Sequence, residues 1–194
     1  MIHDACPKRR VPRSLTGWLS CRRCGLHEHR RKVVFGRGPL PADLLFVGIG
    51  PGVSEDMIGS AFVGESGCLL TKAITKALAL CMIREESTRI HYANLVACHP
   101  TDSLGGANRN PEPDEILACR PLLAEIVALT SPSRTVLLSD ITQRNARVVC
   151  PGAVDMKHPS HVLRAGGERS LAFRRMVREL EDVFRVLKGE GTWQ

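Results

Sequence analysis

Cysteines are the most distinctive chemical feature of this 194-residue sequence, which contains eight of them. Two of these, Cys21 and Cys24, are separated by two residues, and His27 and His29 follow shortly after. Thiolates and imidazoles at such short spacing can hold zinc in a tetrahedral site. Because cytosolic thiols stay reduced, ligation of a metal or cluster explains several of these cysteines better than a disulfide framework does.

Two other segments carry residues that could contact a ligand. Residues 48–56 combine three glycines and a proline with Ser54, Glu55 and Asp56. Glycine lets the backbone approach a ligand closely, although glycine-rich turns between strands and helices are common. Residues 158–164 begin with a His-Pro pair and end with an arginine. Either segment taken alone is also compatible with a purely structural role.

Short apolar runs alternate with amphipathic patterns along the chain. Strands are expected at residues 44–48, 90–97, 135–138 and, more weakly, 147–150, and helices at about 66–81, 113–129 and 173–187. This alternation predicts an α/β fold, a three-layer α/β/α sandwich around a mostly parallel four-stranded sheet, with residues 1–194 as one domain. Ligands bind beyond the carboxyl ends of such strands, which points to the loops after Gly48, Asn94 and Cys150.

The net charge of +7 is unevenly distributed along the chain. Residues 1–37 hold ten Lys and Arg against two Asp and Glu, whereas the rest of the chain holds 17 against 18. A basic segment on a neutral body favours contact with a polyanion such as the phosphate backbone, and a solvated tail is the alternative. No apolar run reaches about 18 residues and residues 1–4 lack a signal-like apolar core, so we expect a cytoplasmic protein without membrane contact. We also expect a monomer.

Taken together, the motifs resemble those of uracil-DNA glycosylases, and most closely the branch that carries an iron–sulfur cluster. The resemblance covers roughly residues 15–187 and is carried by residues 48–52 with Glu55 and Asp56, and by residues 62–64, 94–98, 119–121 and 158–164. It implies a single glycosylase-like domain that binds DNA and rotates its target nucleotide out of the base stack.

The resemblance also implies a ligand set for the cluster. In this branch, cysteines at the positions of Cys21, Cys24, Cys98 and Cys119 hold a 4Fe-4S cluster, which requires four thiolates. The zinc alternative, with Cys21, Cys24, His27 and His29, leaves the other two cysteines without a role. The 20 residues between Cys98 and Cys119 form a longer insert than is usual in the branch, so we expect a reshaped loop there.

The same resemblance assigns the base-binding and catalytic positions. Phe62 is expected to stack on the flipped base, Asn94 to pair with a pyrimidine edge, and His158 to stabilise negative charge on the departing base. The full base-binding set is Gly48, Ile49, Gly50, Pro51, Gly52, Phe62 and Asn94. Glu55 and Asp56 are the further catalytic candidates, and Ser54, Ser160 and Arg164 are candidates for phosphate contacts.

The first motif departs from the family pattern at Ile49, where the branch usually has a glutamate that positions water, and at Gly50, where alanine is usual. Either Glu55 or Asp56 orients the water, or no side-chain base is needed, or hydrolysis is poor. The predicted function is a monofunctional DNA glycosylase that releases uracil or a modified pyrimidine and leaves an abasic site, because the motif loops contain no lysine for a lyase step. The alternatives are a defence glycosylase specific for modified, phage-type bases and a catalytically weak DNA-binding module.

Overall fold

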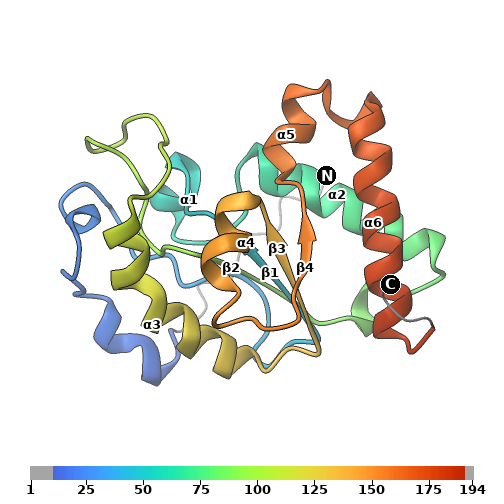
Figure 1. The fold of residues 1–194 in the computed structure, drawn as a ribbon, viewed down its shortest axis with the longest axis horizontal. Coiled ribbons are helices and arrows are strands. Elements are labelled where there is room, and N and C mark those ends of the chain that lie inside the picture. Colours follow the sequence, from blue (N-terminus) through green and yellow to red (C-terminus); the bar gives the residue numbers. More distant parts are fainter. Residues whose placement is uncertain (1–10, 191–194) are drawn as a thin grey trace.

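A parallel four-stranded sheet lies between two layers of helices (Figure 1). The computed structural model describes residues 11–190, so Cys6 and the basic residues 8–10 lie outside the described part of the chain. The strands are β1 (Leu44–Gly48), β2 (Ile90–Asn94), β3 (Arg134–Leu138) and β4 (Val154–Met156), in the order β2-β1-β3-β4. All three pairings are parallel, which confirms the three-layer α/β/α prediction.

The two faces of the sheet are covered by different helices. The longer helices are α2 (Glu65–Leu80), α3 (Pro113–Thr130) and α6 (Leu171–Leu187), and the shorter ones are α1 (Val53–Ile58), α4 (Asp140–Ala146) and α5 (Pro159–Arg164). Short 3-10 turns lie at η1 (Arg13–Trp18), η2 (Gly25–His27), η3 (Glu85–Ser87) and η4 (Gly167–Arg169). Leu44 and Phe46 of β1 point to α2 and α6, whereas Leu45 and Val47 point to α3. Because β1 is buried on both faces, it reads as an uninterrupted apolar run.

The fourth strand is the element that was predicted wrongly. Residues 147–150 form a turn after α4, and the strand lies at β4 instead. The apolar run misled the prediction because its members have different environments: Val148 is 69% exposed, whereas Cys150 is buried in the α3-facing core. Gly152 adopts a positive φ of 70° in the turn that leads into β4.

The second strand is also shorter than predicted, because it ends at Asn94 together with its neighbour β1. The chain beyond it stays buried but leaves the regular ladder. Leu95 N–H still donates to the carbonyl of Gly48 and Val96 N–H to that of Ile49. The loops after β1 and β2 are therefore held side by side at the carboxyl edge of the sheet.

A segment preceding β1 covers the outer edge of β2. Arg37 and Tyr92 form an antiparallel bridge in which each N–H donates to the other's carbonyl, at 2.9 and 2.7 Å. Gly36 and Gly38 flank Arg37 with φ values of 140° and 120°. A Cβ on either would lie 2.4 or 2.1 Å from a carbonyl oxygen of β2, so glycine is required for this close approach.

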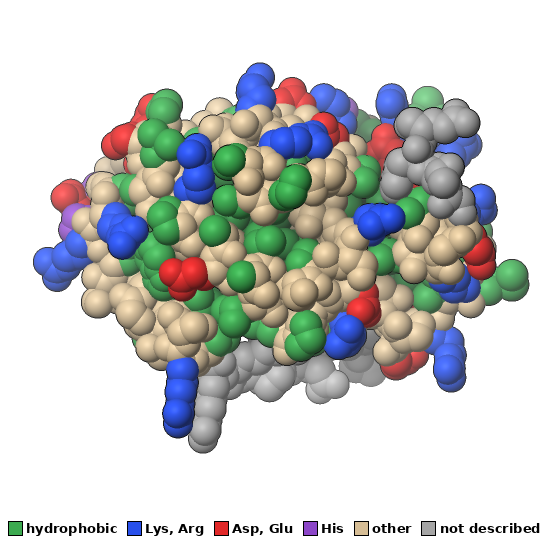
Figure 2. Space-filling view, turned by 60° about the horizontal axis from the view of Figure 1, so that its bottom comes forward, with side chains coloured by type: hydrophobic (Ala, Val, Ile, Leu, Met, Phe, Trp, Pro, Cys, Tyr) green, Lys and Arg blue, Asp and Glu red, His purple; other side chains and the backbone are tan. Residues whose placement is uncertain are grey.

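Figure 2 shows the molecule from below the view of Figure 1, largely from the amino ends of the strands. Hydrophobic side chains occupy the middle of this face, and the described Lys and Arg side chains are scattered around it. No helix among residues 11–190 is long and apolar enough to cross a membrane.

Candidate active site and cysteine cluster

One pocket collects most of the predicted ligand-binding residues at the carboxyl edge of the sheet. Its walls come from the loop and helix after β1, the start of α2, the end of β2, the loop before α3, and α5 with the residue preceding it. The lining residues are Gly50, Gly52, Val53, Ser54, Glu55, Phe62, Gly64, Glu65, Ser66, Gly67, Asn94, Asn108, His158 and Leu163. Four predicted base-site positions, Gly50, Gly52, Phe62 and Asn94, are among them, whereas Gly48, Ile49 and Pro51 lie outside this lining.

Phe62 and Asn94 are held against each other by the glycine at the end of β1. A Cβ on Gly48 would lie 2.7 Å from Oδ1 of Asn94 and 2.7 Å from Cζ of Phe62. Phe62 itself adopts a φ of 56°, a conformation that is costly for an aromatic residue, and its ring packs on Tyr92 with centroids 5.5 Å apart. The apolar wall and the amide are therefore fixed relative to each other.

Asn94 lines the pocket, and only 7% of the residue is exposed. An amide has one acceptor and two donors, which suits the edge of a nucleobase.

His158 precedes α5 and caps it with its own side chain. Its Nδ1 accepts the backbone N–H of Ser160 at 3.1 Å and lies 2.9 Å from the Ser160 hydroxyl oxygen. Burial, and then the nearby Arg164, lower the pKa of His158 to about 4, against a smaller raising effect of Glu55. The imidazole is therefore neutral near pH 7, and because Nδ1 is an acceptor, its hydrogen is on Nε2.

The two acidic candidates have different positions. Glu55 lines the pocket, but its carboxylate accepts three backbone N–H groups, from Gly52 at 3.1 Å, Val63 at 2.9 Å and Gly64 at 2.7 Å. Asp56 is only 1% exposed and does not line the pocket. Its carboxylate accepts the backbone N–H groups of Arg31 and Lys32, which ties α1 to the N-terminal segment.

The three candidates for phosphate contact differ in their exposure. Ser54 is exposed at the pocket, and Arg164 is exposed at the end of α5. Ser160 is partly buried, and both its N–H and its hydroxyl face Nδ1 of His158.

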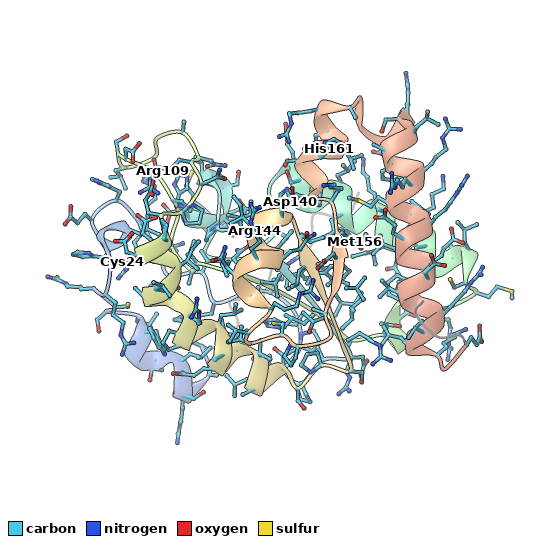
Figure 3. All side chains as sticks on the ribbon, in the orientation of Figure 1. Cys24, Arg109, Asp140, Arg144, Met156 and His161 are labelled. Carbon is cyan, nitrogen blue, oxygen red and sulfur yellow. The ribbon has the colours of Figure 1, made fainter. Side chains whose placement is uncertain are left out.

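Figure 3 marks His161 in α5 and Arg109 in the loop above α3, on the two sides of the carboxyl edge.

Asn108 is a pocket residue that the sequence reasoning missed. It lies in the long loop after Cys98, and its Nδ2 would be 3.2 Å from a Cβ on Gly52. The expectation that this loop is reshaped was the available signal, because a loop following β2 ends at the same edge of the sheet as the loop following β1.

A second pocket is formed around the four predicted cluster ligands. Cys21, Cys24, Cys98 and Cys119 all line it, together with Arg30 and apolar residues from η1, η2 and α3. Burial raises the pKa of the Cys98 thiol to about 11 and that of Cys119 to about 12, and it also raises the pKa of Cys24. Such thiols lose their protons when a strongly cationic group binds them.

The donor set of this pocket fits a cluster better than the local zinc site. His27 turns its Nδ1 to the carbonyl of Cys24 at 2.8 Å, and neither His27 nor His29 lines the pocket. Within residues 11–190, no three His, Cys, Asp or Glu side chains are grouped closely enough for a single metal ion. In a four-iron cluster each thiolate binds a different iron atom, so its ligands are spread more widely.

Arg30 belongs to the basic segment of residues 1–37 that was predicted to contact a polyanion, but its side chain points inward. Its guanidinium donates to Sγ of Cys98 at 3.4 Å and to the carbonyl of Cys21 at 2.6 Å. Arg22 and Arg31 are exposed, and Arg23, also exposed, lies over the ring of Trp18, 4.7 Å from its centroid.

The chain is similar to known proteins of one family. Residues 35–181 match the family described as the uracil DNA glycosylase superfamily. A protein of Thermotoga maritima named Type-4 uracil-DNA glycosylase is 33% identical over 189 residues, which cover 88% of this chain and 91% of that protein. Proteins of the same name from Sulfurisphaera tokodaii and Saccharolobus solfataricus are 38% and 40% identical, over 62% and 58% of this chain. The chain spans about half the length of these last two relatives, 50% and 47%.

The fold and the pocket define a three-layer α/β/α protein with a ligand site at the carboxyl edge of a parallel sheet. The chain belongs to the uracil DNA glycosylase superfamily, and its relatives place it in the family-four branch.

Proposed function

We propose that this protein is a DNA glycosylase that hydrolyses the N-glycosidic bond of uracil or a modified pyrimidine and leaves an abasic site. The observation that carries the proposal is the pocket in which Phe62, Asn94 and a neutral His158 lie together. A base rotated out of the duplex would stack on Phe62 and pair with the amide of Asn94. The Thermotoga maritima relative, matched over most of both chains, carries the name of a uracil-DNA glycosylase.

The chemistry assigned to His158 follows from its protonation state. As the bond between the base and C1′ of the sugar breaks, the bonding electrons leave with the base as an anion. The Nε2–H of a neutral imidazole donates a hydrogen bond to the base oxygen on which this charge collects, which stabilises the transition state. Water then adds its hydroxyl to C1′, and its proton is released.

Neither of the two acids that were predicted to orient the water has a free carboxylate. Both oxygens of Glu55 are already engaged with backbone N–H groups, and Asp56 is engaged outside the pocket. We therefore assign both acids to the structure of the loop rather than to proton transfer. Glu65 and the amide of Asn108, together with the backbone of Gly50 and Gly52, are polar groups of the pocket that are left to orient water.

Cys21, Cys24, Cys98 and Cys119 are the residues that would hold a 4Fe-4S cluster. Its assigned role is to fasten the N-terminal segment to α3 and to the loop after β2. No step of base release passes through it. Ser54, Arg164 and the exposed Arg22 and Arg31 are proposed to contact phosphates of the DNA backbone.

The preferred base is proposed to be a modified or enlarged pyrimidine, because Ile49 and Gly50 replace the glutamate and alanine that are usual in the branch. Gly50 lines the pocket, whereas Ile49 does not, so only the change at Gly50 lies directly on the pocket wall. The test is to incubate the protein with duplexes that contain uracil or one of several modified pyrimidines, followed by alkali to cut abasic sites. Release of uracil alone would contradict the preference for a larger base while supporting the glycosylase.

A catalytically weak DNA-binding module is the second candidate, and the engaged carboxylate of Glu55 favours it. His158→Ala separates the two. In a glycosylase this substitution abolishes base release while salt-sensitive DNA binding persists. In a binding module no release is detected with either protein.

A further inference from the structure

His99 is a fully buried histidine that the proposed chemistry does not use. It follows Cys98 directly and has 0% exposure. Its Nε2 lies 2.6 Å from Oδ1 of Asn108, on the wall of the pocket. Its Nδ1 is buried and has no hydrogen-bond partner among the described residues. A buried imidazole with a single polar partner, which itself lines the site, calls for an explanation.

The unpartnered nitrogen decides which way the hydrogen bond runs. A neutral imidazole has one N–H and one acceptor nitrogen. If Nε2 accepted a hydrogen bond from the Asn108 amide, Nδ1 would carry a buried N–H without an acceptor. If Nε2 donates to Oδ1, the orphaned atom is only an acceptor. Orphaned buried N–H groups are the rarer case, so the second arrangement is favoured.

The orientation of the Asn108 amide follows from this bond. With Oδ1 occupied by His99, the amino group Nδ2 is the atom left to face the pocket, and it is the amide atom nearer to Gly52. The loop around it is held independently. Arg109 N–H donates to the carbonyl of Pro100 at 3.0 Å, and its guanidinium pairs with both Asp102 and Glu115 at 2.7 Å.

We infer that His99 is a positioning residue that locks the Asn108 carboxamide so that its N–H donors face an oxygen atom in the pocket. The inference rests on the proposed function for the meaning of the pocket, but not for the bond itself. It gives the wall beside Gly52 a hydrogen-bond donor. It also links the pocket to Cys98, because His99 is the next residue along the chain.

The test combines His99→Phe, Asn108→Ala and the double variant in single-turnover base release, with the duplex that the wild type cleaves best. Loss of one oriented hydrogen bond is expected to slow release about tenfold in each single variant. Because His99 acts through Asn108, the double variant is expected to be no slower than Asn108→Ala. His99→Gln, whose amide N–H can donate to Oδ1, should recover most of the rate, and iron content should stay at the wild-type level in all four.

Multiplicative losses in the double variant, or an unchanged rate in His99→Phe, would overturn the inference and leave the glycosylase intact. If His99→Phe fails to fold or loses iron, the rates of His99→Gln and Asn108→Ala are compared instead. A nearly wild-type rate in His99→Gln beside a slow Asn108→Ala supports the inference, and equal rates in the two variants contradict it. A second readout needs no activity: the ¹⁵N shifts of the His99 ring should report hydrogen on Nε2, and hydrogen on Nδ1 alone would contradict the proposal. If the wild type releases no base from any duplex, the proposed function fails while this measurement still tests the bond.

Discussion

His158 is the side chain whose surroundings constrain the chemistry most directly, because its two nitrogens have different tasks. Nδ1 caps α5 through the N–H of Ser160, and Nε2 is left for the pocket. Asn94 and Phe62 complete the set, and each of the three comes from a different loop or strand end. A helix cap, a strand end and a strained loop residue thus provide the contacts that the proposed base requires.

The first prediction concerns pH. The pKa of His158, lowered by burial and Arg164 to about 4, leaves the imidazole neutral over the whole range above about pH 5. Base release by the wild type should therefore stay constant with respect to this group from pH 9 to about pH 6 and should fall with a midpoint near pH 4. A His158→Gln variant should lack this acidic limb. A wild-type midpoint near 6.5 would show that the histidine is not buried as described.

The lowered pKa of His158 also makes the free energy of unfolding depend on pH. Between pH 6.5 and about 4 the unfolded chain binds a proton at this histidine and the folded chain does not. The free energy of unfolding should therefore decrease as the pH falls through this window, by roughly 2–3 kcal/mol in total. Urea titrations of the wild type and His158→Gln at pH 7 and pH 4.5 measure the difference, and parallel losses in both proteins would exclude His158 as its source.

Gly48→Ala tests the contact between Phe62 and Asn94. The added Cβ would lie 2.7 Å from atoms of both residues, so one of them must move. We expect a loss of about 1–3 kcal/mol in stability and a fall of base release by at least about tenfold. A methyl group added at an open position provides the control, since a Cβ on Gly17 meets no atom within 4 Å. Equal activity of Gly48→Ala and Gly17→Ala would show that this contact does not set the geometry of the pocket.

At the scale of elements, the loop between β2 and α3 depends on one buried carboxylate. Glu115 is 5% exposed and accepts two hydrogen bonds from Arg109 and one from the backbone N–H of Glu112. Burial alone would raise the pKa of Glu115, but the hydrogen bond from Arg109, with smaller contributions, lowers it. This pair is what holds the loop that carries Asn108.

Glu115→Gln should therefore loosen that loop. Removing one partner of a buried pair is expected to cost about 2–4 kcal/mol, and base release should fall because Asn108 is no longer fixed. Glu179→Gln is the matched control, because the Arg175–Glu179 pair is an exposed pair one helical turn apart and should contribute under about 0.5 kcal/mol. Thermal unfolding of both variants measures the contrast, and similar losses would contradict it.

The elements differ in how well the sequence alone specified them. The strand at β1 and the helix α6 were clear because their burial follows the apolar pattern, from Phe173 to Phe184 in α6. The fourth strand was not, because β4 has only three residues and one of them, Asp155, is exposed. The role of Asn108 could not be inferred from its neighbours in sequence, since its position depends on a hydrogen bond to buried His99 and on the pairing of Arg109.

At the scale of the whole molecule, the cysteine pocket joins segments that are far apart in the sequence. Cys21 and Cys24 lie before the sheet, Cys98 follows β2, and Cys119 lies in α3. Figure 1 shows the N-terminal segment, in blue, running beside α3 on one side of the sheet. A group bound to all four thiolates would cross-link these parts.

Cys119→Ser should release that link. We expect the purified variant to lose the visible colour and the roughly four iron atoms of the cluster, and to be cut by protease within residues 11–37. Cys68→Ser, at an exposed cysteine that does not line the pocket, is the control and should keep its iron. If the wild type contains no iron and its four thiols are nevertheless shielded from thiol reagents, the cluster is contradicted.

The segment around Arg37, which covers the outer edge of β2, affects the solubility of the protein. It follows the cysteine-bearing segment and pairs with the outer edge of β2, so it occupies backbone groups that would otherwise be open to a neighbouring molecule. An uncovered edge strand is a template for intermolecular pairing. Loss of the cluster would then expose this edge as well as loosen the N-terminal segment, and iron-depleted preparations should assemble into β-rich aggregates on warming. The cluster would in that case protect the protein from self-association.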